Sequence, residues 1–330
     1  MVILYGSGKH DKGRSFTIKS RKMNDNRSVY SESVAYAFFK TFLVPCLRPA
    51  FFNCIYSIFK SFFFRQFRAA MLPGRVPVSR VDHHLDAKIP FVPSWVTIYL
   101  DFTTFWIRIL SFMLRRWKRD SYAVVKDFIH SIIRLYLFAS QVYTKNFSTT
   151  NRPFYIARPR FFLIHLVDPH LMCVPSLHVM VVINTYTKFA AIVRSMGEEE
   201  KLNRQTAEIK NGALAITQAI LFVKQHSVNC IAASLYAMTC FDPEAFPLQE
   251  AEAFTSLLFT ETAQDNELKL PANCRVHPSA APGTRLPQEV QAEIKAHILN
   301  LYRRFLYEKP QAKIWNEPLL NFMRSLPQGY

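Results

Sequence analysis

The chain has 330 residues, a formal net charge of +17 and a composition that is 50% hydrophobic and 14% aromatic. Its 29 phenylalanines are more than an ordinary soluble core needs, although the mean hydropathy is only +0.02. The apolar residues are concentrated between about residues 34 and 241, and both ends are polar. This contrast argues against a soluble globular domain and predicts a membrane core with soluble flanks.

The basic residues lie mostly between apolar runs and do not form one long basic helix, so we expect no nucleic acid partner. Positive charge beside membrane spans attracts anionic lipid headgroups and helps to set topology. Six cysteines show no CxxC pair and no regular spacing. We therefore expect no metal site, no cofactor and no disulfide framework.

The first predicted elements follow a basic N-terminal segment, residues 1–33. The apolar stretch Val34–Phe64 contains charged residues and proline, so it forms either one kinked span or two shorter pieces. Trp95–Leu114 and Tyr122–Tyr143 predict two spans, and the short basic turn Arg115–Arg119 between them indicates a helical hairpin.

Three shorter and partly polar spans are predicted next, at Ser176–Val193, Asn211–Val223 and Ser227–Phe241, and we expect them to pack inside the bundle. Residues 242–330 are richer in proline and acidic residues and predict a soluble tail. An amphipathic helix begins in this tail near Pro287. Its apolar residues at helical spacing are Val290, Ile294, Ile298, Leu301, Tyr302 and Phe305.

The predicted fold class is therefore all-α. We expect a polytopic membrane helical bundle of about six transmembrane helices over residues 34–241, with a soluble C-terminal tail. We expect the protein to lie in the cell (inner) membrane. The basic clusters at Arg115–Arg119 and Arg194–Lys210 would then be cytoplasmic, as would both termini, because six spans put both termini on the same side. The predicted site would face away from the cytoplasm. The basic loop over residues 65–88 would then lie outside too, which runs against this charge bias.

Three segments at span boundaries carry side chains suited to phosphate chemistry. In KNFSTTNRP, Lys145 and Arg152 can bind phosphate oxygens. Basic residues at span ends often have only a structural role, in which the side chain extends to keep its charge in water. In VPSLH, Ser176 and the first N–H groups of a helix form an anion site next to His178. A lone histidine there is also a common structural residue.

The third segment, KQHSVNC, carries Lys224 and His226 between the last two spans. Because successive spans alternate in direction, the end of the third span, the start of the fourth and the end of the fifth meet at one membrane surface. The sequence therefore predicts a phosphate-ester site at which all three segments meet.

These motifs resemble those of the type 2 phosphatidic acid phosphatase superfamily, K-x6-RP, PSxH and SR-x5-H-x3-D. PSLHV, KQH and the upstream IPFVP are most similar to the branch with inositol phosphorylceramide synthase and sphingomyelin synthase. The resemblance covers roughly residues 80 to 240. The matching positions are Lys145, Arg152, Pro153, Pro175, Ser176, His178 and His226.

The resemblance implies that His226 attacks phosphorus and that His178 protonates the leaving alcohol. It further implies that Lys145, Arg152 and Ser176 stabilise the phosphoryl oxygens, with Lys224 as a further cation. Water as the acceptor gives a phosphatase, and a lipid or sugar alcohol gives a phosphotransferase. Both would act on a lipid phosphate.

The third motif is incomplete, because Cys230 stands where an aspartate is expected and Ala219 and Ile220 replace its serine and arginine. A carboxylate would orient His226, which a neutral thiol does poorly. Another acid, such as Asp168 or Asp82, can take its place. Asp168 and His170 lie in a loop from which they can reach the site, although we expect them to cap or to lie on the surface. The alternative to an active enzyme is therefore a catalytically impaired relative that binds phosphate headgroups without turnover. A transporter or channel subunit is a third possibility.

Overall fold

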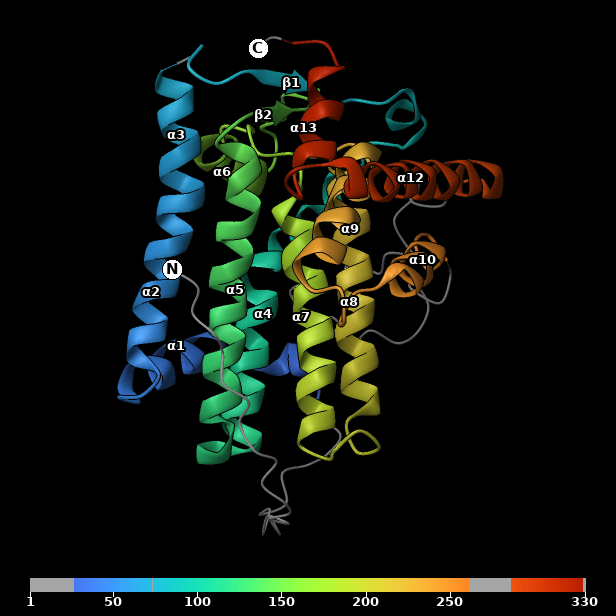
Figure 1. The fold of residues 1–330 in the computed structure, drawn as a ribbon. Helices are drawn as coiled ribbons and strands as arrows, with labels where there is room; N and C mark the ends of the chain where they lie inside the picture. Colours follow the sequence, from blue (N-terminus) through green and yellow to red (C-terminus); the bar gives the residue numbers. More distant parts are fainter. Residues whose placement is uncertain (1–26, 73, 261–285, 329–330) are drawn as a thin grey trace.

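The computed structural model describes residues 27–72, 74–260 and 286–328, and these are mostly helical. Four long helices run side by side (Figure 1). They are α4 (Val96–Arg116), α5 (Tyr122–Tyr143), α7 (Leu177–Ser195) and α8 (Asn203–Phe222), and α9 (Val228–Phe241) packs against α7. The all-α prediction is therefore confirmed.

The first apolar stretch is divided into two pieces. Helix α1 (Val34–Leu43) ends just before Pro45, and a proline cannot donate the backbone hydrogen bond that a helix interior requires. The second piece is continuous through α2 (Arg48–Ile58), the π-helical turn η2 (Phe59–Phe63) and α3 (Phe64–Met71). It lies along α5.

Short elements cover one end of the bundle, which we call the site end. There α5 finishes, α7 begins, and α8 turns into α9. Strand β1 (Val78–Arg80) pairs in parallel with β2 (Phe147–Thr149), with Val78 opposite Phe147. The other short elements described before residue 171 are η3 (His84–Lys88), η4 (Pro93–Trp95) and α6 (Pro159–Val167) near this end. At the opposite end lie η1 (Val29–Ser31) and η5 (Lys118–Ser121).

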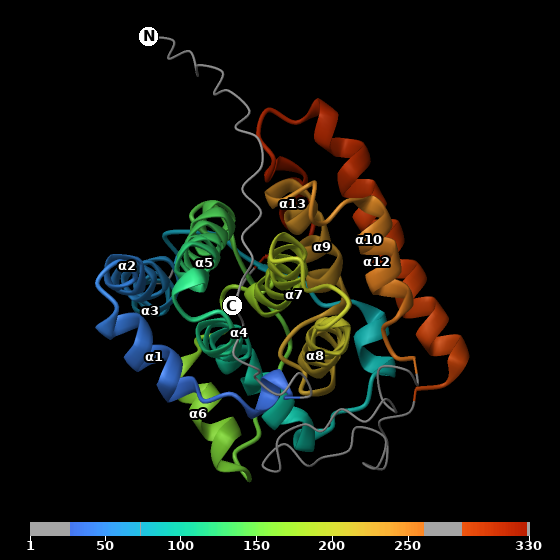
Figure 2. The ribbon, with the colours of Figure 1, turned by 90° about the horizontal axis from the view of Figure 1, so that it is seen from below.

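The described residues after 242 pack against the bundle. They form α10 (Leu248–Ser256), α12 (Gln288–Glu308), η8 (Lys309–Gln311) and α13 (Glu317–Arg324). Helix α12 lies on α9 and buries Ile294, Ile298 and Tyr302, while α13 contacts β1. Figure 2 shows α10 and α12 on one side of the bundle, with α1, α2 and α6 on the other.

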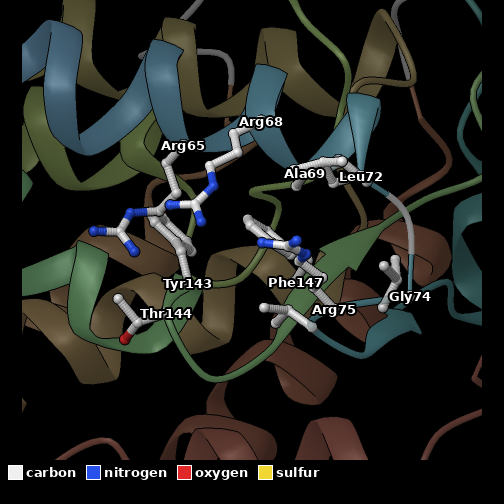
Figure 3. Close-up of a pocket in the computed structure, with 12 residues that line it drawn as sticks. Arg65, Arg68, Ala69, Leu72, Gly74, Arg75, Tyr143, Thr144 and Phe147 are labelled. Carbon is white, nitrogen blue, oxygen red and sulfur yellow. The ribbon is translucent and has the colours of Figure 1, made fainter.

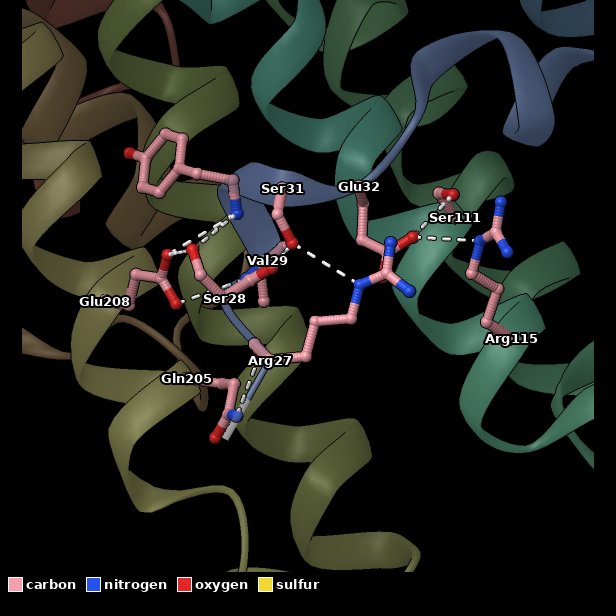
Figure 4. Close-up of polar contacts among 10 residues, drawn as sticks. Arg27, Ser28, Val29, Ser31, Glu32, Ser111, Arg115, Gln205 and Glu208 are labelled. Carbon is pink, nitrogen blue, oxygen red and sulfur yellow. Dashed lines mark hydrogen bonds and ion pairs between the residues drawn. The ribbon is translucent and has the colours of Figure 1, made fainter. Parts of the chain in front are cut away.

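The N-terminal residues are tied to the end opposite the site. The buried carboxylate of Glu32 pairs with Arg27 at 2.9 Å and with Arg115 at 3.0 Å (Figure 4). Glu208 of α8 accepts a hydrogen bond from the backbone N–H of Val29 at 3.2 Å. These contacts hold the segment before α1 against both α4 and α8.

Among the described residues, one helix, Pro93–Arg116, is long and apolar enough to cross a membrane; α1 and α9 are apolar but shorter. Large exposed apolar side chains are concentrated on α1, on α2 through α3, and on α6. Examples are Phe39, Phe52, Tyr56, Phe59, Phe64, Met71, Phe162 and Leu166.

Candidate functional site

Two histidines meet at the site end, one from each of two predicted motifs. Nε2 of His226, in the turn between α8 and α9, lies 3.2 Å from Nδ1 of His178, in the first turn of α7. The ring centres are 5.1 Å apart, and both side chains are buried. Residues 48 positions apart are thus brought into direct hydrogen-bond contact.

Ser176 is the third member of this contact. Its Oγ lies 3.3 Å from Nε2 of His226, and its backbone N–H donates to Oγ of Ser234 at 2.8 Å. Ser176 precedes α7 in an extended conformation, and its side chain does not cap the helix. The N–H groups of the first turn of α7 therefore open toward the two histidines, where the helix dipole favours an anion.

Aromatic rings of α4 fix the orientation of His178. Tyr99 stacks on the imidazole with ring centres 4.6 Å apart, and Phe102 approaches it at 4.0 Å. Phe102 also lines an apolar cavity of about 340 Å³ between α1, α2, α4 and α5. One wall of the histidine site is thus shared with a large apolar space.

Arg152 reaches this region from the loop after β2. Its guanidinium donates to the side chain of Gln225 at 3.2 Å and to the backbone carbonyl of Asp168 at 3.0 Å. Gln225 is the residue directly before His226, so these contacts place the guanidinium beside the histidine turn. The Asp168 carboxylate lies 4.0 Å from Arg152, which leaves the cation only weakly paired.

The two predicted lysines are not brought to the histidines. Lys145 is exposed just after α5, and within the described residues its amine makes no hydrogen bond or ion pair. The Lys224 amine donates to the backbone carbonyls of Asp86 and Ile89. Lys224 thereby holds the η3 turn in place and is not available to an anion in this arrangement.

The absence of the expected aspartate leaves one nitrogen of His226 without a carboxylate partner. Nδ1 of His226 is buried and has no hydrogen-bond partner in the described part of the chain. Cys230, four residues later in the first turn of α9, is fully buried and its thiol forms no disulfide. Neither proposed substitute reaches His226: Asp168 accepts from the His170 N–H, and Asp82 accepts from the Asn151 N–H.

A third histidine, His170, lies in the same cluster. The expectation that it caps or lies on the surface is wrong, because the side chain is 5% exposed. Its Nε2 is 2.7 Å from Oγ1 of Thr150, and its ring centre is 6.2 Å from that of His226. The sequence carries no spacing signal for this residue, since the loop before α7 brings it inward.

Burial keeps the loop histidines neutral. It lowers the pKa of His226 to about 3, with repulsion from His170 adding to the effect and the Cys173 backbone opposing it. Burial likewise lowers the pKa of His170 to about 3, helped by the nearby charge of Arg152. A neutral His226 has a free lone pair on one ring nitrogen, as a nucleophile requires.

Asp86 holds the turn that contains His226 through a hydrogen bond to the start of α9. The sequence alone did not single out this residue. One carboxylate oxygen accepts from the backbone N–H of Val228 at 3.0 Å, at the start of α9. The other accepts from the His83 N–H at 2.8 Å. Burial raises the pKa of Asp86, and these hydrogen bonds act in the opposite direction.

Within residues 27–72, 74–260 and 286–328, no group of three or more His, Cys, Asp and Glu side chains is arranged to hold a metal ion. Comparison of the chain with protein-family models, with curated proteins and with solved structures finds no match. The fold and the site together define a helical protein with a buried Ser-His-His cluster and a flanking arginine.

Proposed function

We propose that the protein is an integral membrane phosphatase or phosphotransferase that acts on a lipid phosphate through a phosphohistidine at His226. One observation carries this proposal. The Nε2 atom of a neutral histidine lies within 3.3 Å of both a serine hydroxyl and a second histidine, at the N-terminus of a helix. Nucleophile, proton donor and anion stabiliser are thus side by side.

In the proposed reaction, the lone pair on Nε2 of His226 attacks phosphorus and forms an N–P bond. The P–O bond to the leaving alcohol breaks, and His178, which enters this step as an imidazolium, gives the alkoxide a proton and becomes a neutral imidazole. Water or a second alcohol then attacks phosphorus, transfers its proton to His178 and releases His226. Arg152, Ser176 and the first turn of α7 stabilise the negative phosphoryl oxygens.

The direct contact between the rings implies a rearrangement when substrate binds. Phosphorus must lie between the attacking nitrogen and the leaving oxygen that His178 protonates, and a separation of 3.2 Å leaves no space for it. The substrate therefore replaces the hydrogen bond between His226 and His178. Catalytic hydrogen bonds often adopt their final geometry only in such complexes.

Two features support a lipid substrate and a membrane location. The apolar cavity behind Phe102 offers space for a hydrocarbon tail next to His178. The exposed aromatic and aliphatic side chains of α1, α2, α3 and α6 form a surface suited to lipid. We propose that this side of the bundle lies in the membrane, in a multi-pass arrangement with the site facing away from the cytoplasm.

The second candidate function is binding of phosphate headgroups without turnover. It is favoured by the unpartnered Nδ1 of His226 and by Cys230 at the position of the orienting carboxylate. Without that carboxylate, the imidazolium that develops as the N–P bond forms is less stabilised.

Phosphate release from phosphatidic acid by the purified protein in detergent tests these alternatives. We expect the parent to release phosphate and His226→Ala to lose all activity, while His130→Ala, a half-buried histidine on α5, retains it. Equal release by His226→Ala and the parent would rule out the catalytic assignment. Binding of phosphatidic acid by a parent that neither releases phosphate nor transfers it to an added alcohol would support the second function.

A further inference from the structure

A second cavity, of about 230 Å³, lies between α3, β2 and the end of α5. Three arginines line it: Arg65 and Arg68 from α3, and Arg75 from the loop that leads to β1 (Figure 3). Tyr143, Thr144 and Phe147 form the facing wall. Neither His178 nor His226 lines this cavity, so it is separate from the histidine site.

No acidic side chain in the described part of the chain neutralises the positive charge in this cavity. The lining contains no Asp or Glu, and within the described residues none of the three arginines forms an ion pair. The Nε atom of Arg65 is buried without a hydrogen-bond partner. Arg65 and Arg68 are three residues apart on one helix, where like charges repel. Such an arrangement is stabilised by an anion that accepts several hydrogen bonds at once.

The rest of the cavity and its surroundings are apolar. The lining is completed by Ala69, Leu72, Gly74, Val76, Val78 and Leu171. Outside it, Phe64, Phe67 and Met71 are exposed on α3 and continue the apolar surface of α2. A ligand whose anionic group lies in the cavity can therefore place an apolar part against this surface.

We propose that the cavity binds the phosphate of an anionic membrane phospholipid, with the acyl chains lying along the apolar surface of α2 and α3. Arg65, Arg68 and Arg75 provide charge-assisted hydrogen bonds to the phosphate oxygens. The exposed Lys145 follows Thr144 of the cavity wall and adds positive charge near its opening. This inference is independent of turnover at His226, because it concerns binding alone.

Native mass spectrometry of the purified full-length protein, titrated with phosphatidylglycerol or with phosphatidylcholine, tests the proposal. We expect phosphatidylglycerol to be retained and phosphatidylcholine to be lost. Arg68→Gln/Arg75→Gln should weaken phosphatidylglycerol binding by about tenfold or more. The matched control, Arg119→Gln/Arg204→Gln, removes two exposed positive charges at the opposite end of the bundle and should bind as the parent does.

Three outcomes would overturn the proposal. Equal weakening by both double variants would indicate a general charge effect. No weakening in either would mean that the arginines do not bind the lipid. Displacement of phosphatidylglycerol by inorganic phosphate alone would make a free phosphate the ligand. The single variant Arg75→Gln changes only an exposed loop residue, so its smaller loss of affinity tests the site without risk to the helices.

Discussion

The Nε2 atom of His226 and the Nδ1 atom of His178 share one hydrogen bond of 3.2 Å, so exactly one of these two nitrogens carries the proton between them when both rings are neutral. For Nε2 of His226 to attack phosphorus, the proton must sit on His178. The other nitrogen of His226, Nδ1, then carries its own proton, which no side chain among the described residues accepts. The strength of the nucleophile therefore depends on what is placed next to Nδ1.

The variant Cys230→Asp tests this dependence. A carboxylate four residues after His226, in the first turn of α9, should accept the proton on Nδ1 and stabilise the imidazolium. We expect phosphate release to rise by at least about tenfold. Cys230→Asn serves as the control, because asparagine has nearly the same shape as aspartate but carries no charge. An unchanged or lower rate in Cys230→Asp would mean that another group has taken over this role.

Asp86 should be important for stability and for the position of His226. Replacing it by alanine removes the acceptor for the Val228 and His83 N–H groups, and we expect a loss of about 2 kcal/mol in the free energy of unfolding. Thermal unfolding in detergent measures this loss. Asp82→Ala, which changes an exposed carboxylate four residues earlier, should cost less than half as much.

Gly212 allows α8 to approach the N-terminal segment closely. A Cβ atom at this position would lie 1.9 Å from the Tyr30 hydroxyl oxygen and 2.7 Å from the Phe105 ring. We expect Gly212→Ala to destabilise the fold by about 1–3 kcal/mol. In a Tyr30→Phe background the same change should cost less, because the closest clashing atom is gone. An equal cost in both backgrounds would contradict this account.

Acid should destabilise the folded protein between about pH 6.5 and pH 3. His226 and His170 have pKa values lowered to about 3 by burial, so in this range the unfolded chain binds more protons than the folded one. Stability therefore falls as pH falls, by up to about 1.4 kcal/mol per pH unit for each histidine. Chemical unfolding followed from pH 7 to pH 4 measures the slope, and His170→Gln should reduce it. A variant with the parent's slope would show that His170 does not contribute.

The helical nature of the chain could be predicted from its apolar runs, as could the meeting of three span ends. Ser176 and His178 lie where that reasoning expects them, because the start of α7 fixes both. Arg152 also lies near the histidines, but from the loop after β2, where contacts to Gln225 and Asp168 hold it. Lys145 and Lys224 do not, since a long flexible side chain can turn toward other partners from the same backbone position. Lys224 turns to the carbonyls of η3, a contact made across 135 residues of sequence.

His170 and Asp86 could not be assigned from sequence for a related reason. Both lie in irregular segments, where no periodicity connects a position with the direction of its side chain. The backbone of His170 has a positive φ of 62°, which turns the loop inward before α7. Asp86 holds the start of α9 only because the fold brings it next to Val228, 142 positions later in the chain.

The small sheet at the site end includes a contact from the last described residues. Ser79 in β1 hydrogen-bonds with the side chain of Gln328 at 2.9 Å, and the Arg80 N–H donates to the carbonyl of Pro327 at 2.9 Å. Both contacts join segments that are far apart in the sequence, 249 positions for Ser79 and Gln328. The helices around His178 and His226 can therefore assemble during synthesis, whereas the cover over the site end can be completed only after residue 328 has been added.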